Sequence, residues 1–151
     1  MLLTDLLTVD RIRIPLQAQT KDDLLNELVL VAMADAPESD QAAVLRAVSE
    51  REAVLSTGIG YGVAIPHGKT GLLSELRMAA GRSVEPMEFD ALDGLPVQLF
   101  FLLIGPEAAA GPHIKALSRI SRIVRQDDVR AELIAAPDAQ TFMRILQNAA
   151  D

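Results

Sequence analysis

The chain has 151 residues, half of them apolar, a formal net charge of −7 and no cysteine. A chain of this length fits one domain, residues 1–151, and can bury about 70% of the surface that its unfolded form exposes. The absence of cysteine excludes disulfides, thiolate metal sites and thiol nucleophiles, while the negative charge argues against a nucleic acid partner.

The first third of the chain predicts one short strand and two helices. A turn of helix over 5–9 precedes a strand over 11–14, which Pro15 restricts to the edge or the end of a sheet. Thr20 is placed to cap a helix. The expected inward stripe of this helix consists of Leu24, Leu25, Leu28, Leu30 and Val31. The next helix covers about 39–53, with three apolar residues at helical spacing: Val44, Leu45 and Val48.

The middle of the chain is rich in glycine and then in strands. Four of the nine glycines lie at positions 58 to 68, a density typical of tight turns and close backbone approach. We expect strands over 63–65, 76–83 and 97–104. The last is apolar almost throughout, which predicts burial on both faces. It is also too short to span a membrane, so no direct membrane insertion is expected.

The C-terminal part of the chain predicts three helices. Gly111-Pro112 places a proline at a first helical position, so that His113 lies in the first turn. The expected apolar face of this helix consists of Ile114, Leu117, Ile120 and Val124. Shorter helices begin at Asp127 and Asp138. Because the N-terminus also lacks the basic region of a signal sequence, we expect a cytoplasmic protein.

His67 is one of only two histidines and lies at the end of the glycine-dense segment. Pro66 fixes the backbone before it and Gly68 lets the chain turn after it, so the imidazole can be held rigidly and still be accessible. By position alone, a satisfied or merely exposed histidine is the more common interpretation of His67. The residues around it carry the functional interpretation.

The stretch REAVLSTGIGYGVAIPHGK, residues 51–69, resembles the phosphorylation-site signature of the type-2 enzyme IIA family of the phosphoenolpyruvate-dependent sugar phosphotransferase system. The stretch FDALDGLPV, residues 89–97, and the later His113 follow in the order and approximate spacing that this family shows. The resemblance covers nearly the whole chain. It implies an α/β fold, a single domain with a mixed β-sheet of about five strands flanked by helices.

The same resemblance implies a phosphocarrier function. His67 would accept a phosphoryl group from the phosphohistidine of an HPr-type carrier and pass it to a IIB domain, or use it to regulate a target protein. Neutral imidazole is a nucleophile near pH 7. Transfer between two histidines needs positioning and hydrogen-bond donors, so we expect no metal and no nucleotide cofactor at this step.

Arg51 and His113 match positions that line the active site in this family. A guanidinium can contact a phosphate at two points, although Arg51 lies between Glu50 and Glu52 and could pair with carboxylates alone. His113 could instead be an exposed residue at a helix start. The hydroxyls of 56–57 could also donate to a phosphate, but such groups commonly bond the local backbone.

Three other functions are weighed against this one. A P-loop needs four residues between its first glycine and the Gly-Lys pair, whereas five separate Gly62 from Gly68. A metal hydrolase is disfavoured because the two histidines are 46 positions apart and no HExxH occurs. A IIA-like binding module that has lost phosphotransfer stays open.

Among the branches of the family, the stretch STGIG, residues 56–60, and the chain's lack of permease segments look most like nitrogen-regulatory or fructose-type members.

Overall fold

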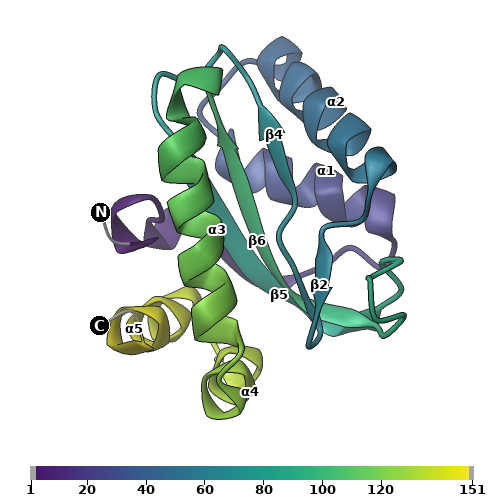
Figure 1. Cartoon of the computed structure of the whole chain (residues 1–151), viewed down its shortest axis with the longest axis vertical. Helices are drawn as coiled ribbons and strands as arrows, with labels where there is room; N and C mark the ends of the chain where they lie inside the picture. The colour runs from purple at the N-terminus through teal and green to yellow at the C-terminus, as the bar shows by residue number, and fades with distance from the viewer. Residues whose placement is uncertain (1–2, 150–151) are drawn as a thin grey trace.

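The computed structural model describes residues 3–149, which form a mixed six-stranded sheet with helices on both faces (Figure 1). The strands run in the spatial order β1-β5-β6-β3-β2, and β4 also pairs with β6. They are β1 (Ile12–Leu16), β2 (Gly58–Gly60), β3 (Val63–Ala64), β4 (His67–Lys69), β5 (Arg77–Met87) and β6 (Val97–Gly105). The predicted α/β fold with about five strands is thereby confirmed.

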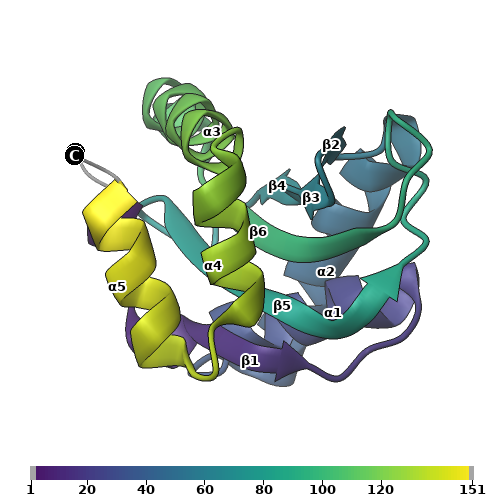
Figure 2. The same ribbon diagram turned by 90° about the horizontal axis from the view of Figure 1, so that it is seen from below.

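Two helices cover one face of the sheet and three cover the other (Figure 2). On one side lie α1 (Lys21–Ala32) and α2 (Glu38–Val54), and on the other α3 (Ala110–Val124), α4 (Asp127–Ala135) and α5 (Ala139–Ala149). Short 3-10 helices are η1 (Leu3–Asp5), η2 (Val9–Arg11) and η3 (Glu107–Ala109). Among residues 3–149, no helix is long and apolar enough to cross a membrane.

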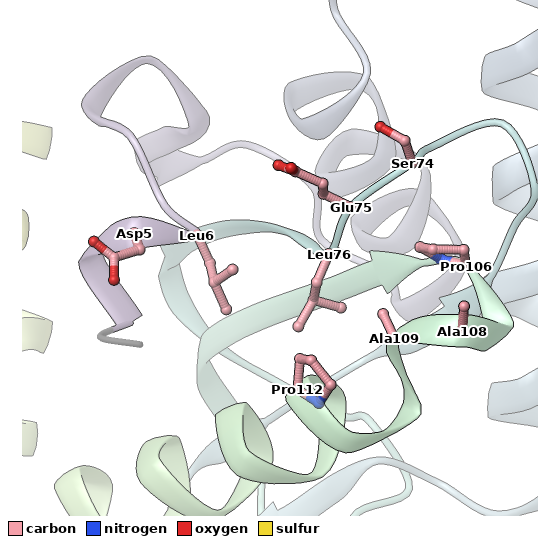
Figure 3. A pocket seen from close by; sticks show the side chains of 9 residues that line it. All are labelled: Asp5, Leu6, Ser74, Glu75, Leu76, Pro106, Ala108, Ala109 and Pro112. Atoms are coloured by element: carbon pink, nitrogen blue, oxygen red, sulfur yellow. The ribbon is translucent and has the colours of Figure 1, made fainter.

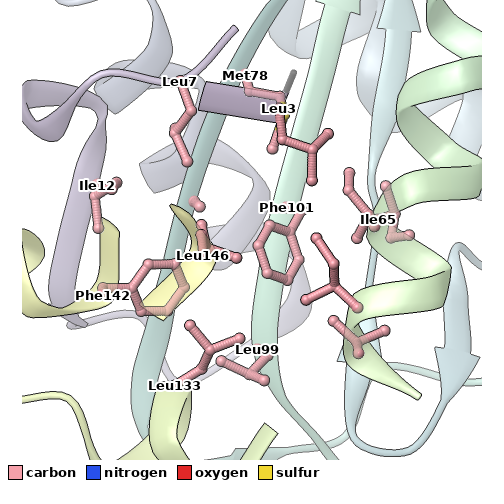
Figure 4. Packing of buried hydrophobic residues seen from close by; sticks show 14 of the residues in the cluster. Leu3, Leu7, Ile12, Ile65, Met78, Leu99, Phe101, Leu133, Phe142 and Leu146 are labelled. Atoms are coloured by element: carbon pink, nitrogen blue, oxygen red, sulfur yellow. The ribbon is translucent and has the colours of Figure 1, made fainter. Parts of the chain in front are cut away.

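The central strand β6 supplies both hydrophobic cores. Its side chains alternate between the two faces because successive residues of a strand point in opposite directions. Phe101 belongs to the core under α3, α4 and α5, where Figure 4 shows it beside Phe142 and Leu146. Phe100 belongs to the core under α1 and α2. The predicted burial of this strand on both faces is therefore confirmed.

The edges of the sheet follow from local chemistry. β1 is an edge strand, as Pro15 predicts, and it pairs in parallel with β5. Thr20 caps α1 by accepting a hydrogen bond from the backbone N–H of Asp23 at 3.3 Å. The predicted helix over 5–9 is wrong, because the chain forms η1 and η2 on either side of an irregular segment.

Two residues expected on inward helix faces are exposed. Leu30 in α1 is 40% exposed and Ile114 in α3 is 67% exposed. Each lies two positions from a buried neighbour, Leu28 and Ala116 respectively, and two positions correspond to about 200° around a helix. The sheet therefore meets the side of each helix that carries Leu28 or Ala116, and Ile114 faces outward next to His113.

Candidate functional site

His67 begins β4, the short strand that runs parallel to β6. The following residue explains why α2 can pack so closely against this strand. A Cβ atom added to Gly68 would lie 3.0 Å from Cγ2 of Val48 and 3.1 Å from its backbone nitrogen. Only glycine leaves room for that approach. It brings the C-terminal part of α2, with Arg51, to the same end of the sheet as His67.

The two histidines face each other although 46 positions separate them in the chain. The ring centroids of His67 in β4 and His113 in α3 lie 5.1 Å apart, with an angle of 73° between the ring planes. Nδ1 of His67 lies 2.9 Å from the carbonyl oxygen of Ile65. Since a carbonyl only accepts hydrogen bonds, a neutral His67 ring carries its proton on Nδ1 and keeps a lone pair on Nε2.

The surroundings of both rings favour the neutral form. Burial is the largest cause that lowers the pKa of His67, and the charges of Arg51 and Lys69 lower it further. The Ile65 carbonyl and the Glu52 carboxylate act in the opposite direction. For His113, burial and then the neighbouring His67 lower the pKa to about 4. Both imidazoles are therefore neutral near pH 7. A neutral ring can act as a nucleophile through its free lone pair, and it can still donate one N–H hydrogen bond.

Arg51 lies in the same pocket, so all three predicted site residues come together. This pocket has a volume of about 580 Å³, and its lining consists of Ala47, Glu50, Arg51, His67, Gly68, Lys69, His113 and Leu117. One guanidinium nitrogen of Arg51 donates to the carbonyl oxygen of Leu55 at 2.9 Å. A guanidinium has five N–H donors, so this bond leaves capacity for a phosphate.

Lys69 adds a second cation that the sequence analysis did not assign to the site. Its ammonium group lies 3.2 Å from the carboxylate of Glu107, and the Lys69 and Glu107 side chains are 49% and 82% exposed. Such a pair contributes little stability, so it leaves the positive charge available near the pocket. Residues i and i+2 of a strand share a face, and that rule would have placed Lys69 beside His67.

The hydroxyls before the glycine-dense segment bond the protein itself. The Thr57 hydroxyl donates to the carboxylate of Glu52, and the Ser56 hydroxyl donates to the carbonyl oxygen of Phe89 at 3.1 Å. Both therefore have local structural partners rather than a place in the pocket lining.

A separate pocket of about 440 Å³ lies beside the start of α3 (Figure 3). It is mainly apolar and is bounded by Leu6, Leu76 and Pro112 among others. Its titratable side chains, Asp5 and Glu75, are carboxylates and would repel a phosphate. Within residues 3–149, no group of three or more His, Cys, Asp or Glu side chains is placed to hold a metal ion.

An α/β domain that presents two neutral, facing histidines beside an arginine is a scaffold suited to carrying a phosphoryl group. Residues 5–149 match the family described as phosphoenolpyruvate-dependent sugar phosphotransferase system, EIIA 2. The chain belongs to this family, and its role is that of a phosphocarrier or a regulator within the system. The resemblance found in the sequence is confirmed.

Individual relatives agree with this assignment. A nitrogen regulatory protein of Bradyrhizobium diazoefficiens is 39% identical over 144 residues, which cover 95% of this chain and 94% of the relative. The fructose-specific EIIABC component of Bacillus subtilis is 34% identical over 97% of this chain but only 23% of its own length. Among solved structures, the nitrogen regulatory protein IIA-Ntr of Neisseria meningitidis superposes with a TM-score of 0.87 at 32% identity, covering 95% of this chain and 98% of the other.

Proposed function

We propose that Nε2 of His67 accepts a phosphoryl group from the phosphohistidine of an HPr-type carrier protein. The observation that carries this proposal is the hydrogen bond between Nδ1 of His67 and the Ile65 carbonyl, because it keeps the proton away from Nε2. The second histidine and two cationic side chains in the same pocket suit a phosphoryl group that arrives with negative charge.

The proposed transfer exchanges one N–P bond for another. The Nε2 lone pair of His67 attacks phosphorus, and as the new bond forms the donor's N–P bond breaks and its electron pair returns to the donor imidazole. The His67 ring gains positive charge, which the Ile65 carbonyl stabilises through the Nδ1–H bond. The negative charge of the transferring group spreads over its equatorial oxygens.

His113 and Arg51 would act on those oxygens. A neutral His113 ring has one N–H to donate, and the 5.1 Å between the centroids of the two rings supports the proposal that this donor would reach the transferring group. Arg51 can add a two-point contact of planar geometry. Neither residue would carry the phosphoryl group itself, so their role is to stabilise the charge that develops during transfer.

For the onward step we favour the nitrogen-regulatory branch, in which a target protein would respond to the phosphorylation state of His67. The support is that relatives similar over nearly their whole length carry nitrogen regulatory names. Onward transfer to a IIB domain, as in a sugar-transport system, is the other candidate and is supported by the fructose-specific relatives.

A single domain over 1–151 and a cytoplasmic location remain predictions.

Reconstituted phosphorylation tests this proposal. Phosphoenolpyruvate, enzyme I and an HPr-type carrier should add one acid-labile phosphate to the wild-type chain and none to His67→Ala, whereas ATP alone should add none. His113→Ala is the matched control, since it removes the other imidazole of the same pocket and should still be labelled, more slowly, when the reaction is followed to its end point. Labelling of His67→Ala would overturn the site assignment. An unlabelled wild type, with carriers active on another IIA domain, would favour the non-catalytic binding module.

A further inference from the structure

Glu52 is a buried carboxylate next to the proposed phosphate contact Arg51. It lies in the last turn of α2 and is only 5% exposed. An ionised carboxylate at such a position is costly unless it is paired and hydrogen-bonded. Its oxygens accept the backbone N–H of Thr57 at 3.0 and 3.2 Å, they also accept the Thr57 hydroxyl, and the Lys21 ammonium lies 3.0 Å away.

The residue that Glu52 holds is linked by hydrogen bonds to His67. The Thr57 carbonyl accepts the backbone N–H of Ile65 at 3.0 Å. The Ile65 carbonyl in turn accepts the Nδ1–H of His67 at 2.9 Å. Glu52 is thus connected to the proposed acceptor imidazole through two residues, Thr57 and Ile65.

This path bears on which nitrogen of His67 is free. The tautomer of a neutral imidazole is set by the hydrogen bond that its other nitrogen makes. If the Ile65 carbonyl loses its fixed place, the proton can reside on Nε2, and the ring then has no lone pair at the nitrogen that faces the donor. The strands β2 and β3 beside this path are only three and two residues long, so few ladder hydrogen bonds, mainly to β6, hold the Ile65 carbonyl besides the bonds through Thr57.

We propose that Glu52 is a positioning residue for phosphoryl transfer, which acts through Thr57 and Ile65 to hold His67 with its proton on Nδ1. The inference rests on the proposed role of His67 as acceptor. Lys21 completes the arrangement by balancing the charge of Glu52, and it ties the start of α1 to the end of α2. The charge of Glu52 also raises the pKa of His67, which opposes the effects of Arg51 and Lys69.

Glu27 provides a control of the same chemistry elsewhere in the fold. Its carboxylate accepts the backbone N–H groups of Gln17 and Ala18 at 2.8 to 3.0 Å and lies 3.4 Å from a guanidinium nitrogen of Arg13. The segment that it holds connects β1 to α1 and lines no part of the histidine pocket. Glu27→Gln therefore removes a carboxylate anchor of backbone N–H groups without touching the path to His67.

The experiment compares Glu52→Gln with Glu27→Gln in the full chain. Phosphorylated HPr-type carrier is the probe, and single-turnover transfer is measured over a range of carrier concentrations together with imidazole ¹⁵N spectra and urea unfolding. Glu52→Gln should lower the maximal rate by roughly tenfold or more, by analogy with the loss of the outer partners that orient a metal-bound histidine. The half-saturating carrier concentration should hardly change, and His67 should show mixed tautomers. Glu27→Gln should lose stability only.

Thr57→Val is a milder second variant in case Glu52→Gln fails to fold. It removes the hydroxyl bond to Glu52 but keeps the backbone contacts, so it should shift the His67 tautomer in the same direction by a smaller amount. A wild-type rate with a wild-type His67 spectrum in Glu52→Gln, or in Thr57→Val if the first variant does not fold, would overturn the inference. Equal slowing by Glu27→Gln would also overturn it. The tautomer measurement needs no phosphate donor, so it tests Glu52 even if His67 proves not to be the acceptor.

Discussion

The long strands and the short strands of the sheet are built in different ways. β5 and β6 are 11 and 9 residues long, pair with each other over most of that length, and bury apolar side chains on both faces. β2, β3 and β4 have two or three residues each, and the turn around Tyr61 runs through left-handed conformations at Gly60 and Gly62. Short ladders to β6 hold β3 and β4, and side-chain bonds to backbone groups, such as those between Glu52 and Thr57, supplement them. The comparison indicates that the long strands supply stability and that the short ones position the histidine.

The largest effect that this comparison predicts is on stability. Phe101→Ala in β6 should lower the free energy of unfolding by about 3–5 kcal/mol, because it removes a fully buried ring that packs against Phe142. Phosphate uptake per folded molecule should be unchanged, as the ring faces the core and not the histidine pocket. Urea unfolding combined with labelling at low temperature measures both. Transfer lost in the folded fraction would contradict the division between the two regions.

The next effect is on rate. His113→Ala should slow transfer by on the order of 100-fold to 1,000-fold, the usual cost of losing one donor to developing negative charge, while the phosphate still resides on His67. Stability should change little, since His113 is only half-buried. We expect onward transfer to suffer more than uptake, because the incoming carrier brings contacts of its own. Single-turnover rates equal to wild type in both directions would reduce the site to His67 and Arg51.

The sequence predicts the long strands far better than the short ones. The apolar run of β6 and the cap at Thr20 identify their elements because local chemistry determines them. β2 and β4 have too few residues for a periodic pattern. β2 pairs with β3 across a turn, and β4 pairs with β6, which lies far away in the sequence, so neither pairing is visible in the local sequence.

The candidate site residues were accessible to sequence reasoning to a different extent. His67, His113 and Arg51 were proposed from the family signature, and the structure brings them into one pocket. Glu52 was not proposed, because a glutamate after an arginine in a helix has the sequence pattern of a solvated surface. Only its burial and its contacts with Thr57 distinguish it. Ile114 was misplaced because helical spacing alone does not fix which side of α3 meets the sheet.

The most direct test of the account is to locate the protons and the phosphate on the imidazole nitrogens. Long-range ¹H–¹⁵N spectra of the free and the phosphorylated chain, recorded during a pH titration, resolve each nitrogen. The free protein at pH 7 should show His67 neutral with its proton on Nδ1, and His113 neutral until pH falls to about 4. Phosphorylation should give ¹⁵N–³¹P coupling at Nε2 of His67. A proton on Nε2 in the free protein, or phosphate on Nδ1 or on His113, would contradict the proposed mechanism.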